Sequence, residues 1–331
     1  MKKILIIRFS SIGDIVLTTP VIRCLKLQQS GTSIHYLTKK SFASLLENNP
    51  YVDKVHYIEK TIKEIVDELK NEHFDAIIDL HNNLRSMQVK WILGKPSTSF
   101  KKLNFRKWLL VNFKINTMPS IHVVDRYMQT ISHMGIKNDG NGLDYFIPKK
   151  DEIPLQSLPI THQKGFIGFV IGAKHFTKQL PNEKIISICK QLKYPLILLG
   201  GKEDKQRGDE ISKVVGNTIY NACGIYNLNQ SASLVQQASF IISHDTGFMH
   251  IAAAFKKEIF SIWGNTVPAF GFAPYGASDK SKIIEVTGLS CRPCSKIGYD
   301  KCPKGHFKCM NEIDTAAITC NVSPIDTKAV D

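Results

Sequence analysis

Short apolar segments alternate with amphipathic segments along most of the chain. In the first half, four segments rich in branched aliphatic residues predict buried strands, namely 3–9, 33–38, 54–58 and 75–80. Before the fourth strand, apolar residues recur at the spacing of one helical face over 62–69, and Thr61 with Glu64 forms a capping box at the start of that helix. Short buried strands that alternate with helices indicate parallel βαβ units.

The second half of the chain repeats this alternation. Further strands are predicted at 165–173, 195–200, 218–223, 240–245, 258–264 and 282–286, and helices at 181–192, 204–214, 228–238 and 246–255. Between the halves, residues 148–164 are rich in proline and polar residues and show no period, which is typical of a linker. We therefore expect an α/β protein of two doubly wound domains, residues 1–155 and 156–331.

Length and composition agree with this picture. The chain has 331 residues, of which 43% are hydrophobic, and this is enough to bury a core in each of two domains. No apolar run approaches the roughly 20 residues of a membrane-spanning helix. Arg8 interrupts the first apolar run after Ile7, so that the run is shorter than the apolar region of a signal peptide. These features predict a cytoplasmic protein.

The positive charge of the protein, formally +14, is unevenly distributed. From His81 to His122 there is no Asp or Glu, and basic residues are interleaved with aromatic ones: Arg85, Lys90, Lys95, Lys101, Lys102, Arg106, Lys107 and Lys114, with Trp91, Phe100, Phe105, Trp108 and Phe113. This basic span 81–122 indicates a surface for phosphate-rich or membrane-associated ligands. A solvated basic face above core aromatics, or a nucleic-acid-binding surface, fits the same charge pattern.

Four of the eight cysteines are clustered near the carboxyl terminus. Cys291, Cys294, Cys302 and Cys309 follow the spacing C-x2-C-x7-C-x6-C. A disulfide framework is not expected in a reducing cytoplasm. The spacing is compatible with a zinc site, but packed free thiols are the interpretation that we favour, so that no metal is predicted.

Open parallel α/β sheets bind ligands beyond the carboxyl ends of their strands, and four polar segments occupy such places. The first segment follows the strand at 3–9 and contains Ser10, Ser11, Gly13 and Asp14. No G-x-G-x-x-G motif occurs in the chain, which disfavours a dinucleotide site. Thr19 and Pro20 are suited to start the main helix, which leaves 10–18 as a tight turn. By pattern alone, Asp14 is typical of an acid at a helix start, where the helix dipole stabilises it.

The second polar segment contains Lys178, shortly before the helix that starts near Pro181. A lysine beside a helix N-terminus is suited to bind a phosphate group. An ordinary surface lysine in a loop is the alternative.

The third polar segment follows the strand at 240–245 and leads into a helix. It contains Asp245, Thr246 and Gly247, with His250 one helical turn further on. Asp245 or Thr246 is suited to cap this helix, and the free N–H groups of its first turn make an anion site. A lone helix histidine is usually structural, but its spacing from a strand-end Asp-Thr-Gly favours a role in binding.

The fourth polar segment follows the strand at 75–80 and opens the basic span. It contains His81, Asn82, Asn83, Arg85 and Ser86. The position after a strand places these residues at the ligand-binding edge of the first domain. A polar loop without a ligand is the alternative.

Several segments, taken together and in order, resemble one known family. They are ILIIRFSSIGDIVLTTPVIRCLK, DAIIDLHNNLRS, HVVDRYMQTISHMGI, IGAKHFTKQLP, SHDTGFMHIAAA and CRPCSKIGYDKCPKGHFKC. In these segments the chain is similar to glycosyltransferase family 9, the ADP-heptose:lipopolysaccharide heptosyltransferases. The resemblance extends from residue 3 to about residue 313. One departure is Phe248, where the family often has proline.

The resemblance implies a GT-B fold, in which two Rossmann-like domains face each other across a cleft. The N-terminal domain of such enzymes binds the acceptor, and the C-terminal domain binds the nucleotide-sugar. The family inverts the anomeric configuration and needs no metal for its chemistry. Asp14 matches the general base, Lys178 matches the lysine that binds the donor phosphates, and Asp245, Thr246, Gly247 and His250 match the donor-binding motif.

The resemblance also implies the substrates. The donor is ADP-heptose, which is a substrate, so that no cofactor is expected. The acceptor is a phosphorylated lipid A–core molecule at the inner membrane face, and the residues expected to bind it are Ser10, Ser11, Gly13, His81, Asn82 and Arg85, with peripheral membrane contact through the basic span. A GT-B enzyme that uses another nucleotide-sugar, or an epimerase, stays open as an alternative, and a nucleic-acid-binding protein is a more distant one. No residue distinguishes adenine from uracil.

Overall fold

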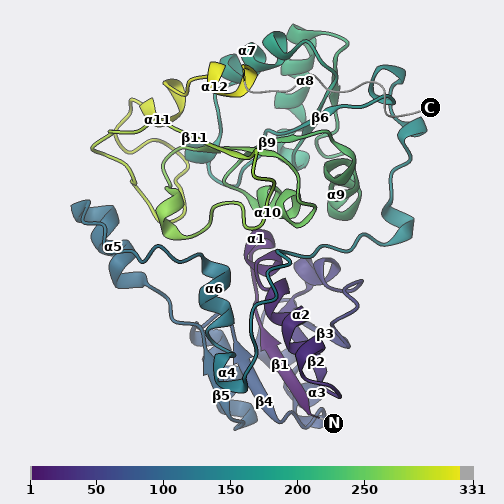
Figure 1. Ribbon diagram of the computed structural model, residues 1–331, viewed down its shortest axis with the longest axis vertical. Helices are drawn as coiled ribbons and strands as arrows, with labels where there is room; N and C mark the ends of the chain where they lie inside the picture. The colour runs from purple at the N-terminus through teal and green to yellow at the C-terminus, as the bar shows by residue number, and fades with distance from the viewer. Residues whose placement is uncertain (1, 321–331) are drawn as a thin grey trace. The chain divides into compact units, whose positions relative to one another are not determined.

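The computed structural model describes residues 2–320, which form two compact units (Figure 1). The first unit contains the residues up to 103 together with 121–146, and the second contains 104–120 and the chain from 147 onward. The chain thus leaves the first unit after Phe146, earlier than the boundary predicted at residue 155. The reason is that 147–155 pack on the second unit, where Asp151 accepts hydrogen bonds from Asn227 and Asn229.

The first unit is built on a parallel sheet with the strand order β3-β2-β1-β4-β5. Its strands are β1 (Lys3–Ile7), β2 (Ser33–Lys39), β3 (Lys54–Ile58), β4 (Ala76–Asp79) and β5 (Ser97–Ser99). The first four confirm the strands predicted from the apolar segments. The short edge strand β5 has the sequence Ser-Thr-Ser and therefore carries no apolar signal.

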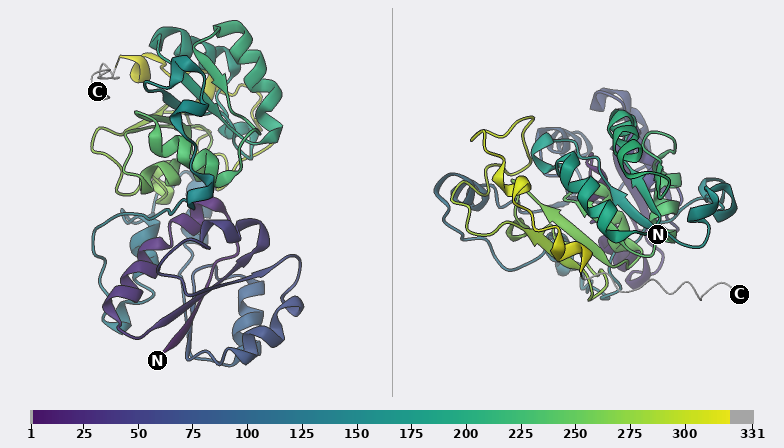
Figure 2. Two further views of the ribbon diagram at one scale, coloured as in Figure 1. Left: turned by 90° about the vertical axis from the view of Figure 1, so that its right-hand side faces the viewer. Right: turned by 90° about the horizontal axis from the view of Figure 1, so that it is seen from above.

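Helices cover both faces of this sheet (Figure 2). They are α1 (Ile12–Val16), α2 (Thr19–Gln28), α3 (Val66–Asn71), α4 (Leu84–Leu93) and α6 (Val123–Met128). Leu69 of α3 and Val89 of α4 pack on the sheet face that carries Leu5 and Ile7, whereas α2 contacts β2 and α6. The segment 10–18, expected as a tight turn, contains the short helix α1, because Ser11 and Asp14 form a capping box at the start of that helix.

The second unit contains a parallel sheet with the strand order β11-β10-β9-β6-β7-β8. Its strands are β6 (Ile167–Val170), β7 (Leu196–Leu199), β8 (Ile219–Asn221), β9 (Ile241–His244), β10 (Ile259–Trp263) and β11 (Lys282–Glu285). All six lie within the segments predicted as strands. The order is that of a Rossmann fold, since the chain starts in the middle, builds to one side and then returns to build the other side.

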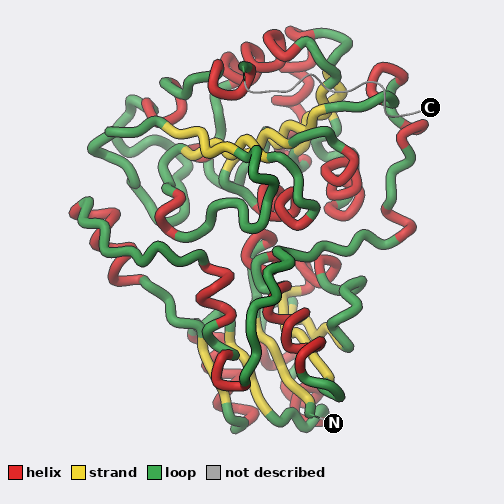
Figure 3. Tube along the Cα trace, in the orientation of Figure 1, coloured by secondary structure: helices red, strands yellow, loops and turns green. Residues whose placement is uncertain are grey.

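The helices of the second unit also lie on both sides of its sheet (Figure 2). They are α7 (Asn182–Leu192), α8 (Lys205–Val215), α9 (Leu228–Gln237), α10 (Gly247–Ala254), α11 (Lys308–Asn311) and α12 (Ala316–Thr319). The unit also contains α5 (Asn104–Phe113). One core contains apolar residues of α7, α8, α11 and α12, whereas α9 and α10 pack against each other. Between β11 and α11, residues 286–307 form no helix or strand and are drawn as a long loop in Figure 3.

The two strand orders fix where ligands are expected to bind. In each unit the order reverses between two adjacent strands, β1 and β4 in the first and β6 and β9 in the second, and open α/β sheets bind ligands at such switch points. All four polar segments predicted to bind substrate follow these four strands. The prediction of an α/β protein with two Rossmann-like, doubly wound domains is therefore confirmed, each domain taken by itself. Among residues 2–320, no helix has both the length and the apolar character needed to cross a bilayer.

Candidate active site

The turn after β1 holds the Asp14 carboxylate with three groups. Asp14 lies in the first turn of α1, where its Oδ2 accepts hydrogen bonds from the hydroxyl of Ser11 at 2.8 Å and from the backbone N–H of Ser11 at 3.2 Å. Its Oδ1 pairs with Nη2 of Arg8 at 2.6 Å. Asp14 is therefore both a helix-start acid, as the pattern indicated, and a carboxylate held in a defined orientation.

Arg8 ties the turn after β1 to the turn after β4. Its Nη1 donates to the carbonyl of Leu80 at 2.7 Å, and its Nε donates to the carbonyl of Ser10 at 2.8 Å. Only 8% of Arg8 is exposed, which an arginine tolerates when its donors are paired. The carbonyl of Leu80 directly precedes His81, so this one guanidinium positions both predicted acceptor segments.

The arginine also sets the protonation state of Asp14. Burial raises the pKa of the Asp14 carboxyl, but the charge of Arg8 and the hydrogen bonds from Ser11 outweigh it, so that the pKa lies below its usual value. Asp14 is consequently ionised at neutral pH and able to accept a proton.

The turn after β4 is organised by Asp79, which is completely buried. Its Oδ1 accepts the backbone N–H groups of His81 at 3.0 Å and Asn82 at 2.7 Å, and its Oδ2 accepts the hydroxyl of Ser86 at 2.8 Å and lies 3.1 Å from Nζ of Lys90. Asn82 adopts a left-handed backbone conformation with φ of 48°. These bonds fix the path of the chain from β4 into α4.

An aromatic ring, Phe9, joins the predicted residues of the two turns. The His81 ring meets the Phe9 ring edge-on with centroids 5.5 Å apart, and the Arg85 guanidinium lies 5.6 Å from the centre of the Phe9 ring. The structure thus brings Asp14, His81 and Arg85 to one end of the first sheet. The sequence did not single out Arg8, Phe9 or Asp79, although an arginine and an aspartate at the ends of buried strands are a usable signal, because such charges are rarely buried without a function or a partner.

His81 is neutral at physiological pH. Burial, followed by the positive charges of Arg8 and Lys102, lowers the pKa of its imidazole to about 4. Its Nδ1 is buried and, among the described residues, has no hydrogen-bond partner. A neutral ring nitrogen of this kind is suited to bind a hydroxyl group of a sugar.

In the second unit, Lys178 and Asp245 form an ion pair at the switch point. Nζ of Lys178 lies 2.6 Å from Oδ2 of Asp245 and 3.2 Å from its carbonyl oxygen, and the Thr266 hydroxyl donates to the same Oδ2 at 2.9 Å. The loop after β6 and the turn after β9 are thereby joined. Thr266, which follows β10, was not among the predicted site residues.

The turn after β9 leads directly into α10. Thr246 is the N-cap residue with an extended backbone, and Gly247 is the first residue of the helix. The N–H groups of the first helical turn and the helix dipole favour an anion at this end. Lys178 adds a positive charge beside the same turn, through its contact with Asp245. His250 lies on α10 and is 4% exposed, so the structure places it in the interior near the helix start.

Buried polar groups hold the loop that carries Lys178. Nε2 of His244 accepts the N–H of Leu180 at 2.9 Å, and burial lowers the pKa of His244 to about 3, which keeps it a neutral acceptor. The guanidinium of Arg207 donates to the carbonyls of Ile171 and Leu180. A Cβ atom at position 172 would lie 2.0 Å from Oδ2 of Asp204, so a larger residue in place of Gly172 would displace that carboxylate.

The cysteine-rich loop supports the same site. Arg292 donates from Nη2 to the carbonyl of Thr266 at 2.8 Å and from Nε to the carbonyl of Gly264. The backbone of Tyr299 exchanges hydrogen bonds with the Thr177 hydroxyl, which precedes Lys178. The loop 286–307 therefore holds the backbone next to Lys178 and at Thr266 in place through these hydrogen bonds.

The four clustered thiols do not converge as a metal centre in the described residues. Cys291, Cys294 and Cys302 are partly buried and Cys309 is buried, all as free thiols, and Sγ of Cys291 lies 3.7 Å from Nε2 of His306. Burial, with the neighbouring thiol of Cys291, raises the pKa of Cys294 to about 11. The prediction of packed thiols instead of zinc stays a prediction, which metal analysis of protein purified without chelator tests.

Within residues 2–320, one group of three potential ligands has all ligand atoms within 4.8 Å of one another, namely His35, His56 and Glu72. His35 and His56 are hydrogen bonded at 2.9 Å, and Lys3 and Lys54 each lie 2.7 Å from an oxygen of Glu72. Two ammonium groups on the carboxylate oppose a cation, so this group is best described as a buried polar network.

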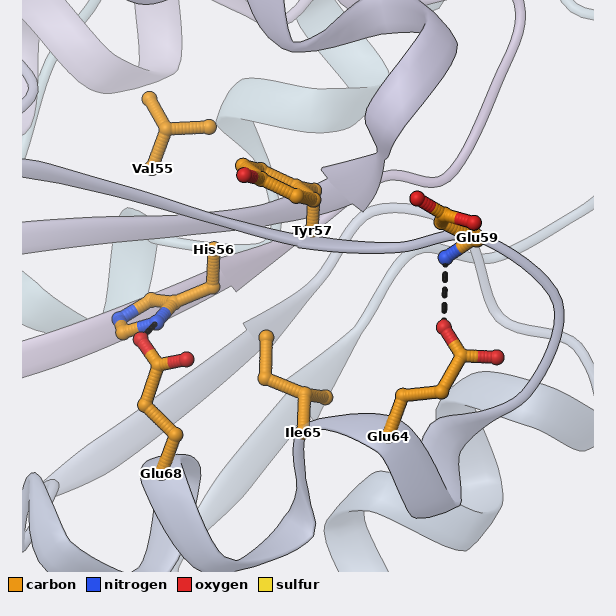
Figure 4. A pocket seen from close by; sticks show the side chains of 7 residues that line it. All are labelled: Val55, His56, Tyr57, Glu59, Glu64, Ile65 and Glu68. Atoms are coloured by element: carbon orange, nitrogen blue, oxygen red, sulfur yellow. Dashed lines mark hydrogen bonds and ion pairs between the residues drawn. The ribbon is translucent and has the colours of Figure 1, made fainter.

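A pocket beside that network is lined by Val55, His56, Tyr57, Glu59, Glu64, Ile65 and Glu68, and Figure 4 shows His56 and Glu68 pointing toward one another. Nδ1 of His56 lies 2.6 Å from Oε1 of Glu68. None of the residues predicted to bind substrate lines this pocket. It is therefore distinct from the switch point between β1 and β4.

Comparison with known proteins identifies the family. Residues 62–302 match the model described as Glycosyltransferase family 9 (heptosyltransferase). The chain belongs to glycosyltransferase family 9. It is 23% identical to a lipopolysaccharide heptosyltransferase 1 of Campylobacter coli over 291 residues, which is 80% of this chain and 84% of the relative.

Solved structures of family 9 share the fold. A glycosyl transferase family 9 protein from Veillonella parvula DSM 2008 superposes with a TM-score of 0.78 and 22% identity, over 97% of this chain and 96% of that one. The ADP-heptose LPS heptosyltransferase II of E. coli superposes with a TM-score of 0.69 and 22% identity, over 94% and 98% of the two chains. The predicted family, the GT-B fold class and the assignment as a glycosyltransferase are thus confirmed.

Proposed function

We propose that this family 9 glycosyltransferase moves heptose from ADP-heptose to the inner core of a lipopolysaccharide, with inversion and without a metal ion. The observation that carries the proposal is the pair of switch points: one presents an oriented, ionised carboxylate, Asp14, and the other presents Lys178 beside a helix N-terminus. The matched relatives are named as lipopolysaccharide heptosyltransferases, which supports this donor and acceptor.

The proposed reaction is a single displacement at the anomeric carbon. An acceptor hydroxyl oxygen forms the new bond to that carbon, while the bond from carbon to the diphosphate oxygen breaks and its electron pair leaves with ADP. Asp14 accepts the hydroxyl proton as general base. Attack from the face opposite to the leaving group inverts the configuration.

Positive charge at the second switch point stabilises the leaving diphosphate. Lys178 supplies one charge, and the N–H groups at the start of α10 supply hydrogen bonds to phosphate oxygens. Asp245 and Thr266 orient Nζ of Lys178 before the donor binds. We assign to these groups the role that a divalent cation has in other transferases, and the proposed reaction uses no cofactor.

The acceptor is bound by the first unit. We assign acceptor binding to the hydroxyls of Ser10 and Ser11, the backbone at Gly13, and the side chains of His81, Asn82 and Arg85, with Arg85 as the charged partner for an acceptor phosphate. The acceptor is a phosphorylated lipid A–core molecule, reached by a cytoplasmic protein that contacts the inner membrane through the basic span.

The experiment that tests the donor is a binding screen of ADP, UDP and GDP by titration calorimetry, followed by turnover of ADP-heptose with a purified inner-core acceptor. We expect ADP to bind at least about tenfold more tightly than UDP or GDP, which corresponds to about 1.4 kcal/mol. Preference for UDP or GDP, or absence of transfer from ADP-heptose, would show that another nucleotide-sugar is the donor. Lys178→Met serves as the matched variant and should lose most of the affinity for ADP.

A further inference from the structure

Helix α4 carries apolar side chains on the side that faces away from its sheet. Its inner side is formed by Ser86 and Val89, which are buried, and Val89 packs in the core of the first unit. Its outer side carries Leu84, Met87 and Trp91, which are 77%, 50% and 86% exposed. The spacing i, i+3, i+7 places these three side chains in one row along the helix.

Such a row is unusual on a surface helix. A helix that packs one side on a core normally has polar residues on the other side, and a helix that is apolar all round is normally buried. None of the described residues covers Leu84 or Trp91. Contiguous exposed apolar side chains mark a surface that meets a partner.

The charges that lie close to the row in the sequence indicate which partner this is. Lys95, Lys101 and Lys102 follow α4 and are exposed, and no Asp or Glu occurs anywhere in the basic span 81–122. A combination of exposed apolar and tryptophan side chains with lysines fits the interface of a bilayer, where the apolar groups enter the acyl boundary and the ammonium groups meet anionic headgroups.

The row also adjoins the acceptor side of the candidate active site. Leu84 is the first residue of α4 and directly follows the turn of His81 and Asn82, and Arg85 lies over the Phe9 ring. A membrane that contacted this row would therefore lie close to the turn of His81 and Asn82.

We propose that Leu84, Met87 and Trp91 dock the protein on an anionic phospholipid bilayer, with Lys95, Lys101 and Lys102 on the headgroups. This inference rests on the proposed function, because a lipid-linked acceptor is what makes docking at this place useful. It narrows the membrane contact predicted for the basic span to one face of α4, which enters the bilayer.

Vesicle flotation of the full-length protein tests the docking face. The vesicles contain phosphatidylethanolamine with phosphatidylglycerol, or phosphatidylcholine alone, and no glycolipid. We expect binding to the anionic vesicles that falls about tenfold or more in the triple variant Leu84→Gln, Met87→Gln, Trp91→Gln. The matched control is Leu27→Gln, Ile160→Gln, Val214→Gln, whose side chains are 61%, 81% and 53% exposed on other elements, and which should bind like the parent.

Tryptophan fluorescence reports insertion directly. The chain has three tryptophans, and in Trp108→Phe the remaining ones are Trp91 and the buried Trp263. We expect a blue shift on addition of anionic vesicles and quenching by brominated acyl chains, both absent in the variant that also carries Trp91→Phe. Equal vesicle binding by the α4 triple variant, or no blue shift, would overturn the proposal.

Two further measurements separate this inference from the other possibilities. A concentration-dependent dimer in light scattering that dissociates in the α4 triple variant would show that a second copy covers the row, and would overturn the proposal. Transfer to a water-soluble, delipidated acceptor fragment should be unchanged in that variant. Transfer without vesicle binding refutes only the docking face, whereas vesicle binding without transfer from ADP-heptose refutes only the proposed function.

Discussion

Asp14 shows how one residue combines a structural role with a chemical one. The hydrogen bonds from Ser11 stabilise the first turn of α1, and the ion pair with Arg8 keeps the partly buried carboxylate charged. A lower pKa makes the carboxylate a weaker base but guarantees that it is deprotonated, which matters for a group that must be ready when the acceptor hydroxyl attacks.

Replacement of Asp14 by Asn removes the proton acceptor and keeps the size of the side chain. We expect kcat to fall by about 10²–10⁴-fold, the usual contribution of a general base, while the Kd for ADP stays within about twofold. Steady-state kinetics and calorimetry measure the two quantities. Asp67→Asn, on the exposed side of α3, is the control; an unchanged kcat in the Asp14 variant would remove the assigned role.

Arg8 gives a second prediction at the residue scale. Because Arg8 lowers the pKa of Asp14 and burial raises it, Arg8→Met should raise that pKa. The acidic limb of the pH profile of kcat/KM, which requires ionised Asp14, should then move to higher pH. If kcat/KM fell at every pH while the acidic limb stayed at the same pH, Arg8 would only support the fold.

At the scale of elements, the switch points explain why distant segments serve one site. The loop after β6 and the turn after β9 follow adjacent parallel strands, so Lys178 and Asp245 meet although they are 67 positions apart. The loop after β10 adds Thr266, and the cysteine-rich loop holds Thr266 through Arg292. Donor affinity therefore depends on residues that need not touch the donor.

A matched pair of substitutions at Thr266 tests this dependence. Thr266→Val keeps the shape and removes the hydroxyl that donates to Asp245, whereas Thr266→Ser keeps the hydroxyl. A hydrogen bond to a charged group is typically worth about 1.5–3 kcal/mol, so we expect the valine variant to bind ADP at least about tenfold more weakly and the serine variant to bind nearly as well as the parent. Calorimetry measures the affinity of each variant for ADP, and equal affinities of the valine and serine variants would refute the orienting role of Thr266.

For the whole molecule, buried neutral histidines make stability depend on pH. Burial lowers the pKa of His35 to about 4 and that of His244 to about 3, from the ordinary value of 6.5. At a pH between the pKa of each histidine in the folded protein and the ordinary value of 6.5, the unfolded chain binds more protons than the folded chain. The free energy of unfolding therefore decreases as pH falls below about 6.5.

We expect the protein to lose on the order of 2–4 kcal/mol between pH 7 and pH 5 through these two groups. Denaturant unfolding at both pH values measures the loss. In His35→Gln the loss should be smaller by roughly 1–2 kcal/mol, whereas His133→Gln, at an exposed position, should behave like the parent. A pH dependence that is identical in both variants would contradict the assignment to His35.

The sequence by itself determined the class of fold and most of the elements. Buried parallel strands are short and apolar along their whole length, and amphipathic helices repeat with their own period, so β1 to β4 and β6 to β11 could be found by pattern. The polar strand β5 could not. The four polar segments were found because ligand sites follow strand ends, and the family resemblance gave the roles of Asp14 and Lys178.

Only the tertiary structure decided which neighbours tune these residues. Arg8, Phe9 and Asp79 in the first unit, and Thr266 and Arg292 in the second, have contacts that depend on strand order and loop packing, which no local pattern encodes. The same holds for α4, whose apolar residues the sequence assigned to a basic span. Exposure is a property of what surrounds a side chain, so only the packed structure shows that Leu84, Met87 and Trp91 lie on the outside.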